Sequence, residues 1–561
     1  MKWKRMRSYL LFVGIWKSWK RSPFGILCDG FRMIDSPQDH GRHIIYLAAI
    51  LLLALSARFY VWVMSPVFNP DGVIYIYQAK ALYYGNIKEL TGCGVNFFSV
   101  YPLLIYLFHF ILGDWEVSAR MVSILFGAAT VVPVYMIVLR FVDLRSALIT
   151  ALIAAVIPVA AGTAGQIVRD HVAWCFVALG LVFFLKHRDE HRMVSNLILS
   201  SGFFLLAAWG RAEAVSFTLL SLCYLAVKGG PHRVKKIAFF SLPIIALTLA
   251  GLIAFYAAKF DIGQSFRIAS MTAIFDDLFD GYTQLRTELE YLAIGLEGRL
   301  RFFVAAARQN IWSLALVLVV VNVIRGLSYF YGIFILFGLK KYQSENGIKT
   351  GELTYIHSLI IFGLMMLYMH TVRCWVMDVR FVMVVILPSL VLAGMGIERL
   401  IGTVTKRGIM SVKAASVLVI GGVLFVGAGN IVRFSEKDKL VFRQIGYSIA
   451  ENAANGRPIA VVASQHIKRW VAYYANSDVD SAVCPEADYD FADIIGSDYD
   501  ALLRNLKSRA ASYLVWEEKN WPTGAFDLSA AARAEDMVRL GSWYHPDTGR
   551  MILFKCALTG R

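Results

Sequence analysis

Charged residues are scarce in this chain. Asp, Glu, Lys and Arg make up only 17% of its 561 residues, whereas hydrophobic residues make up 58%. Together with a mean hydropathy of +0.57, this composition excludes an ordinary soluble protein. The net charge of +16 does not indicate nucleic-acid binding, because Lys and Arg lie mostly in connections between apolar runs. The composition predicts a polytopic α-helical membrane protein.

Cysteine is also rare. Seven cysteines do not form a disulfide framework, and the sequence has no CxxC or Cys/His spacing typical of a metal site. A bridge between Cys484 and Cys556 is one option, but nothing in the sequence compels it. The sequence also has no internal repeat of fixed period and no low-complexity tract, so a solenoid is excluded.

Long apolar runs are what the sequence has instead. Runs long enough, or nearly so, to cross a hydrocarbon core of ~30 Å predict about eleven transmembrane helices. The N-terminal segment and several basic connections belong on the cytoplasmic side by the positive-inside rule, so an odd number of spans carries the tail to the outer face. The run over 311–340, which contains Arg325, is counted as one span, either one long tilted helix or a helix followed by an interfacial piece. The runs begin near Ile44, Ser118, Arg145, His171, Met193, Ala212, Ile237, Ile311, Leu353, Phe381 and Lys413.

Three parts are expected along the chain. Residues 1–43 form a basic cytoplasmic segment, 44–432 the transmembrane domain and 433–561 a small extracytoplasmic α/β domain. Two outer loops, about 65–117 and 259–310, are aromatic and amphipathic, so we expect short helices on the membrane surface. Periodicity in the tail predicts two helices, two buried strands and a hairpin, over 437–453, 497–510, 457–464, 511–517 and 537–558 respectively.

Three acids stand at predicted outer ends of helices: Asp71, Asp170 and Glu213. A carboxylate near a bilayer is costly and tends to mark function, and these three could meet in one outward-facing cavity. Each also has a structural interpretation. Asp71 and Asp170 suit the N-caps of the helices that follow them, and Glu213 suits an ion pair with Arg211.

Three arginines, Arg120, Arg169 and Arg380, lie at the same outer ends. Snorkelling explains any one of them. Outer loops should nevertheless be poor in arginine, so three beside the acids indicate an anionic ligand. A lipid phosphate would meet that requirement.

The stretch DGVIYIYQAKALYYGN at residues 71–86 resembles the first outer loop of the GT-C membrane glycosyltransferases, specifically the protein O-mannosyltransferase and aminoarabinose transferase superfamily. That loop runs Asp, an aromatic, then A-x-x-L-x-x-G. Further resemblances follow in family order over about the first 400 residues. The matching positions are Asp71, Tyr75 or Tyr77, Ala79, Leu82 and Gly85, then Tyr101-Pro102, Gly113-Asp114 with Arg120, Arg169-Asp170, and Arg380-Phe381 with Pro388.

The sequence departs from the family pattern at two places. Gly72 follows Asp71 where many relatives have a second acid, which argues against two carboxylates in this loop. Val100-Tyr101 stands where relatives that modify lipid A have Lys before Pro, so aminoarabinose is not carried over as the sugar.

The resemblance implies transfer of a sugar from a polyprenyl-phosphate donor to a hydroxyl of a cell-envelope glycan, lipid or protein. The reaction would occur with inversion on the outer face of the cytoplasmic (inner) membrane. Asp71 would act as general base with Asp170 beside it, and Arg120, Arg169 and Arg380 would bind the donor phosphate and line the cavity. No cofactor is implied with certainty, and a divalent cation stays open. The expected partners are this donor, its acceptor and membrane lipids, and not nucleic acid.

Two rival functions remain. A glycolipid transporter or flippase would lack glycosyl transfer, and a scaffold would lack catalysis altogether. Transporters typically show repeats and place polar groups near the midplane, whereas these acids lie at helix ends, which favours the transferase. The four tyrosines of residues 71–86 suit a surface helix at headgroup depth, which is the expected position for most of them, and a place in the wall of the sugar or acceptor site is the alternative. They are Tyr75, Tyr77, Tyr83 and Tyr84.

Overall fold

The computed structural model describes most of the chain: residues 37–91, 93, 95, 97–187, 192–257, 269–339, 347–453, 458–479, 481–485, 491–522 and 524–557. Most of the predicted N-terminal segment, 1–43, lies outside these residues.

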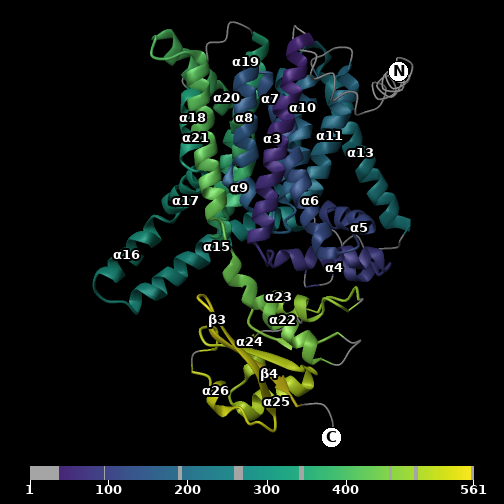
Figure 1. The fold of residues 1–561 in the computed structure, drawn as a ribbon, viewed down its shortest axis with the longest axis vertical. Helices are drawn as coiled ribbons and strands as arrows, with labels where there is room; N and C mark the ends of the chain where they lie inside the picture. The colour runs from purple at the N-terminus through teal and green to yellow at the C-terminus, as the bar shows by residue number, and fades with distance from the viewer. Residues whose placement is uncertain are drawn as a thin grey trace, which may run out of the picture.

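A helical bundle forms one end of the molecule and a small α/β unit the other (Figure 1). The bundle has a helix at each predicted run, and three of those runs are divided into two helices. The helices are α3 Pro37–Met64, α6 Trp115–Ala129, α7 Val131–Leu139, α8 Leu144–Val156, α9 Pro158–Gly162, α10 Asp170–Lys186, α11 Met193–Gly210, α12 Val215–Lys228, α13 Arg233–Ala257, α17 Ile311–Gly326, α18 Phe330–Leu339, α19 Gly347–Cys374, α20 Met383–Lys406 and α21 Val412–Arg433.

The predicted fold class, a multi-pass helical membrane protein with a small C-terminal α/β unit, is confirmed. Within the described residues, seven helices are long and apolar enough to cross a membrane, or eight if one bent pair counts as a span. The prediction of about eleven is higher because it counts two shorter helices, α10 and α12, and also α13, which is not among these seven. α10 has 17 residues and α12 has 14, fewer than the ~20 that a straight crossing needs.

The run over 311–340 is divided into two helices, so the alternative of one long tilted helix is wrong. α17 ends at Gly326 and α18 begins at Phe330. Between them, Ser328 and Tyr329 adopt left-handed backbone conformations with φ of 50° and 59°, which a continuing α-helix does not allow.

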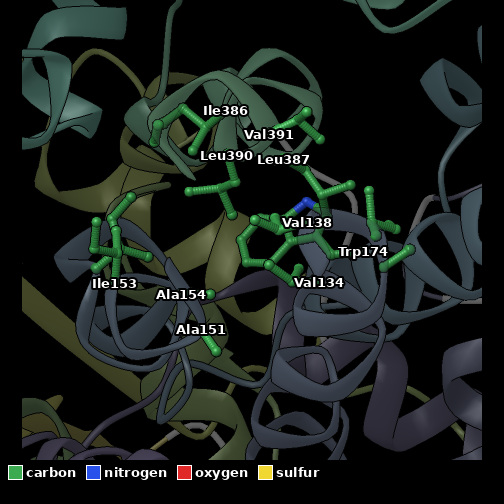
Figure 2. Close-up of a cluster of buried hydrophobic side chains, with 14 of the residues drawn as sticks. Val134, Val138, Ala151, Ile153, Ala154, Trp174, Ile386, Leu387, Leu390 and Val391 are labelled. Carbon is green, nitrogen blue, oxygen red and sulfur yellow. The ribbon is translucent and has the colours of Figure 1, made fainter. Parts of the chain in front are cut away.

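The bundle core lies where α7, α8, α10 and α20 meet. Apolar side chains from these four helices pack together there, as the labelled residues of Figure 2 show. α18 and α20 approach more closely than side chains would permit, since a Cβ on Gly396 would lie 1.8 Å from the carbonyl oxygen of Phe334. Small residues allow such backbone contact between membrane helices.

Both of the long loops that were predicted to face outward contain helices, although α15, with 26 residues, is not short. The first loop has α4 Asp71–Tyr83, η2 Ile87–Thr91 and α5 Val100–Leu112, and α4 and α5 lie at the end of the bundle that faces the α/β unit (Figure 1). The second loop has α15 Ala269–Ile294 and α16 Gly298–Gln309, which project sideways at that same end. α16 bends by 85° against α17.

The tyrosines of α4 divide into two pairs. Tyr83 and Tyr84 are 46% and 42% exposed, as headgroup contact requires, but Tyr75 and Tyr77 are buried. The ring of Tyr75 packs edge-on against Tyr101 and that of Tyr77 against Tyr473. The headgroup prediction is therefore wrong for Tyr75 and Tyr77, because protein covers this part of α4.

The C-terminal unit contains the predicted helices, strands and hairpin. Its sheet has the order β1-β2-β4-β3, with β1 and β2 parallel and the other neighbours antiparallel. Three of its helices, α23, α24 and α26, were not predicted. The elements are α22 Leu440–Asn452, β1 Val461–Val462, α23 Lys468–Ala475, α24 Phe491–Ile495, α25 Tyr499–Ser508, β2 Tyr513–Glu517, α26 Leu528–Ala531, β3 Met537–His545 and β4 Gly549–Cys556.

A disulfide joins the C-terminal unit to the first outer loop. Cys484 pairs with Cys93, with 5.4 Å between their Cα atoms. The alternative bridge to Cys556 does not form, because Cys556 is a buried free thiol on β4. The two parts of the molecule are therefore covalently linked at a point far from the connection at residue 433.

Candidate active site

Asp71 lies at the start of α4, at the end of the bundle that faces the C-terminal unit (Figure 1). The side-chain oxygen of Asn69 accepts a hydrogen bond of 3.0 Å from the Asp71 backbone N–H. Asn69 therefore satisfies a backbone donor at the start of α4, and the N-cap interpretation of Asp71 is wrong. The Asp71 carboxylate, 43% exposed, instead faces two arginines. Its Oδ1 is 3.2 Å from Nη1 of Arg469 and its Oδ2 is 4.0 Å from Nη2 of Arg380.

Gly72 has no room for a side chain. A Cβ there would lie 2.6 Å from Phe68 Cδ2 and 2.9 Å from Ile167 Cβ, both well inside van der Waals contact. This packing explains why the loop carries one acid where many relatives are expected to carry two.

Asp170 is the buried acid of the site. It is the first residue of α10, makes no side-chain N-cap bond and is only 2% exposed. Its carboxylate pairs with Arg211 through Oδ1 and lies 3.9 Å from Nη1 of Arg380 through Oδ2. The N-cap interpretation of Asp170 is therefore also wrong, because arginines and not backbone N–H groups hold this carboxylate.

Arg380 connects the two acids. It lies in the short helix η6, Val379–Val382, directly before α20. Besides Asp71 and Asp170, its guanidinium approaches Asp378, whose Oδ2 is 2.9 Å from Nε, and Asp378 also accepts the Arg380 backbone N–H. One half-buried guanidinium thus lies among three carboxylates from three separate segments of the chain.

Arg211 belongs to the site, although the sequence indicated it only as a partner for Glu213. That ion pair is present, with 2.9 Å between Nη2 of Arg211 and Oε1 of Glu213. Burial raises the pKa of Glu213, but the charge of Arg211 outweighs it and lowers that pKa to about 2. Burial would lower the pKa of Arg211, yet the carboxylates of Asp170 and Glu213 leave it raised.

Arg169 has the environment expected of a ligand-binding cation. It is half-buried, and its guanidinium lies 4.7 Å from the centre of the Phe97 ring. Among the described residues, no carboxylate lies within ion-pair distance of it. Burial, with smaller contributions from the carboxylates of Asp71 and Asp170, raises the pKa of Tyr75 to about 12, although the charge of Arg169 acts to lower it. A protonated hydroxyl of Tyr75 therefore lies among these charges.

Arg120 is not brought into this cluster. Its side chain is 1% exposed, and Nη1 donates to the carbonyl oxygens of Ser65 and Gly165 at 2.9 Å each. Nε donates to Glu116 at 2.9 Å. These contacts connect the end of α3 with the segment between α9 and α10, so the geometry gives Arg120 a structural role.

The acids do not form a metal site. Among the described residues, no group of three or more His, Cys, Asp or Glu side chains is placed to hold a metal ion. Asp71 and Asp170 face arginines, so a divalent cation would have to displace guanidinium groups from them. The residues present do not fit a resident divalent ion.

Comparison with known proteins finds a family model that matches part of the chain. Residues 99–256 match the family model described as dolichyl-phosphate-mannose-protein mannosyltransferase, a range that includes Arg120, Arg169 and Asp170. No curated protein sequence matches significantly. The predicted resemblance to this family is confirmed.

Two solved structures share the fold. One is ArnT from Cupriavidus metallidurans bound to undecaprenyl phosphate, with a TM-score of 0.58 and 13% identity over 93% of this chain and 99% of that one. The other is the archaeal oligosaccharyltransferase AglB from Archaeoglobus fulgidus, in complex with an inhibitory peptide and a dolichol-phosphate. Its TM-score is 0.56 and its identity 12%, over 93% of this chain and 75% of that one.

Proposed function

With the GT-C fold and the protein-mannosyltransferase family match as premises, we propose that this chain is a membrane glycosyltransferase. It moves a sugar from a polyprenyl-phosphate donor to a hydroxyl of a cell-envelope glycan, lipid or protein. The carrying observation is that Asp71, Asp170 and Arg380, from three distant segments, meet at one end of the bundle, with Asp71 the exposed acid of the pair.

Asp71 is the general base. Its exposed carboxylate accepts the proton of the acceptor hydroxyl while the acceptor oxygen bonds to the anomeric carbon. The bond from that carbon to the lipid phosphate breaks, and the phosphate leaves with the electron pair. A single displacement of this kind inverts the configuration. Arg169 and Arg380 stabilise the charge on the departing phosphate.

Asp170 is a positioning residue. Because it is buried and paired with Arg211 and Arg380, it does not reach an acceptor. Its charge instead orients the guanidinium of Arg380 toward Asp71. Asp71 is thus the base, and Asp170 is the residue that positions Arg380. Arg120 is not included among the arginines that bind phosphate.

The site lies on the outer face of the cell inner membrane. A structural disulfide is typical of an oxidising compartment, and the Cys93–Cys484 bond lies at the same end of the molecule as Asp71. Residues 433–561 are accordingly the extracytoplasmic domain, 44–432 the transmembrane catalytic domain and 1–43 the cytoplasmic segment.

The test is transfer of radiolabelled sugar from a panel of polyprenyl-phosphate sugars to endogenous membrane acceptors. Wild type and Asp71→Asn are compared at matched amounts of folded protein. We expect label to move with the wild type and to fall by about 100-fold or more in the variant. Near-normal transfer in Asp71→Asn would remove Asp71 from its role.

The transporter alternative predicts a different result. A flippase would move the lipid-linked sugar across liposomes in a counterflow assay without forming a glycosidic bond. That result, together with no transfer from the whole donor panel, would replace the transferase proposal.

A further inference from the structure

The C-terminal unit places an arginine on the proposed base. Arg469 lies in the first turn of α23, and its Nη1 is 3.2 Å from Oδ1 of Asp71 across 398 residues of sequence. Arg469 and Arg380 each approach a different oxygen of the same carboxylate. The base is therefore held between one arginine of the bundle and one of the α/β unit.

Packing fixes the position of α23 beside Asp71. The indole of Trp470, next to Arg469, donates to the carbonyl oxygen of Phe68 at 2.6 Å and stacks on Phe442 with 5.2 Å between ring centres. Tyr473, one turn further, packs edge-on against the ring of Phe68. Phe68 is three residues before Asp71, so the α/β unit docks on the segment that carries the base.

A general base must be held in a narrow range of orientations, and misplacement by about 1 Å can cost about 100-fold in rate. The Asp71 carboxylate is 43% exposed and contacts Arg469 and Arg380 from other segments of the chain, so these arginines determine where it points. Arg469 also covers Oδ1, one of the two carboxylate oxygens of Asp71 that could accept a proton from water.

We propose that Arg469 is a positioning residue through which the C-terminal unit controls Asp71. Its guanidinium orients the carboxylate and screens Oδ1 from water until an acceptor hydroxyl reaches the site. The unit thus makes sugar transfer depend on its own docking and suppresses transfer to water. This inference rests on the proposed glycosyltransferase function.

The experiment compares Arg469→Gln and Arg469→Lys with the wild type in the full-length chain. For Arg469→Gln we expect transfer kcat to fall about 10- to 100-fold, with the donor KM unchanged. Hydrolysis of the donor, measured as free sugar, should rise relative to transfer. Arg469→Lys retains a positive charge beside Oδ1 of Asp71 and should return kcat to within about fivefold of wild type.

Arg443→Gln is the matched control. Arg443 also belongs to the C-terminal unit and donates to the first outer loop, at the carbonyl oxygen of Pro66 with 3.3 Å, but it is not paired with a carboxylate of the site. The Arg443→Gln variant should dock its C-terminal unit on the bundle less tightly, without a change in the ratio of hydrolysis to transfer. Equal effects of Arg443→Gln and Arg469→Gln on kcat and on that ratio would overturn the proposal.

The two proposals fail differently. If the wild type transfers sugar and Arg469→Gln does so with unchanged kcat and unchanged hydrolysis, the role of Arg469 is excluded and the transferase function stands. If the wild type transfers nothing from any donor, the transferase function fails, and the proposed role of Arg469 with it. Thermal unfolding of Arg469→Gln, Asp71→Asn and the double variant adds a readout independent of activity. Strictly additive shifts in Tm would contradict the pairing.

Discussion

Asp71 and Asp170 have opposite environments within one site. Asp71 is 43% exposed and Asp170 only 2%, although both face Arg380. Removing one member of a buried ion pair leaves the other charge buried without compensation. This costs much more free energy of folding than the loss of an exposed pair. The same substitution should therefore have different effects at the two acids.

Asp170→Asn should destabilise the fold by about 3–5 kcal/mol, because Arg211 and Arg380 lose their shared buried carboxylate. Asp378→Asn is the control, since Asp378 is 45% exposed beside the same Arg380 and should cost less than about 1 kcal/mol. Thermal unfolding in detergent measures both. An Asp170→Asn protein with the wild-type Tm and no transfer would make Asp170 a catalytic group instead of a support.

Arg120 and Arg169 provide a second contrast. Arg120→Lys should lower Tm, because a lysine cannot reproduce the fork that reaches Ser65, Gly165 and Glu116. Arg169→Gln should leave Tm nearly unchanged and raise the donor KM by about tenfold, because it removes one charge-assisted contact to phosphate. Unfolding curves and donor titrations distinguish the two. A raised KM in Arg120→Lys at unchanged Tm would return Arg120 to the binding site.

At the scale of elements, the packing of α4 determines where Asp71 lies. Gly72→Ala would drive a methyl group into Phe68 and Ile167, which should cost about 1–3 kcal/mol by overpacking and reduce transfer by displacing the base. Gly202→Ala in α11 is the matched control, since nothing lies within 4 Å of its added Cβ and alanine favours a helix. Equal Tm and equal transfer in the two variants would show that α4 tolerates the displacement.

Hydrophobic periodicity predicted the helices of the bundle and the strands of the C-terminal unit, because burial sets that pattern directly. It left open whether the run over 311–340 is continuous, since the residues at the break, Ser328 and Tyr329, are neither Gly nor Pro. It also missed α23, because a segment of only eight residues, KRWVAYYA, is too short for a helical periodicity to be recognised. Tyr75 and Tyr77 were misplaced for a related reason. The sequence of α4 does not show that another domain covers it.

The residues of the site were predictable only in part. Asp71, Asp170 and Arg380 are recognisable because each stands at an outer helix end, where position along the chain implies position in space. Arg211 and Arg469 act on these acids from 41 and 398 residues away. No local pattern reports such pairing, because the fold brings these segments together.

At the scale of the whole molecule, the Cys93–Cys484 bond makes the docking of the C-terminal unit depend on oxidation. In the unfolded chain it would close a loop with a sequence separation of 391 residues, and cross-links of long loops stabilise by a few kcal/mol in the chain-entropy account. Reductant should lower the Tm of the wild type, and a Cys93→Ser/Cys484→Ser variant should show the lower Tm without responding to reductant. A wild type insensitive to reductant would contradict a stabilising bond.

The sidedness of the molecule can be tested through its thiols. Cys374 is exposed at the end of α19, near the site, and the proposed orientation places it outside. A membrane-impermeant maleimide added to intact cells should label Cys374 directly and label Cys93 and Cys484 only after reduction. An Arg407→Cys variant, in the basic connection after α20, should react only once the membrane is permeabilised. The reverse pattern would place Asp71 and the C-terminal unit in the cytoplasm, where a structural disulfide would not persist. A donor whose sugar is presented on the outer leaflet would then be out of reach of the proposed base.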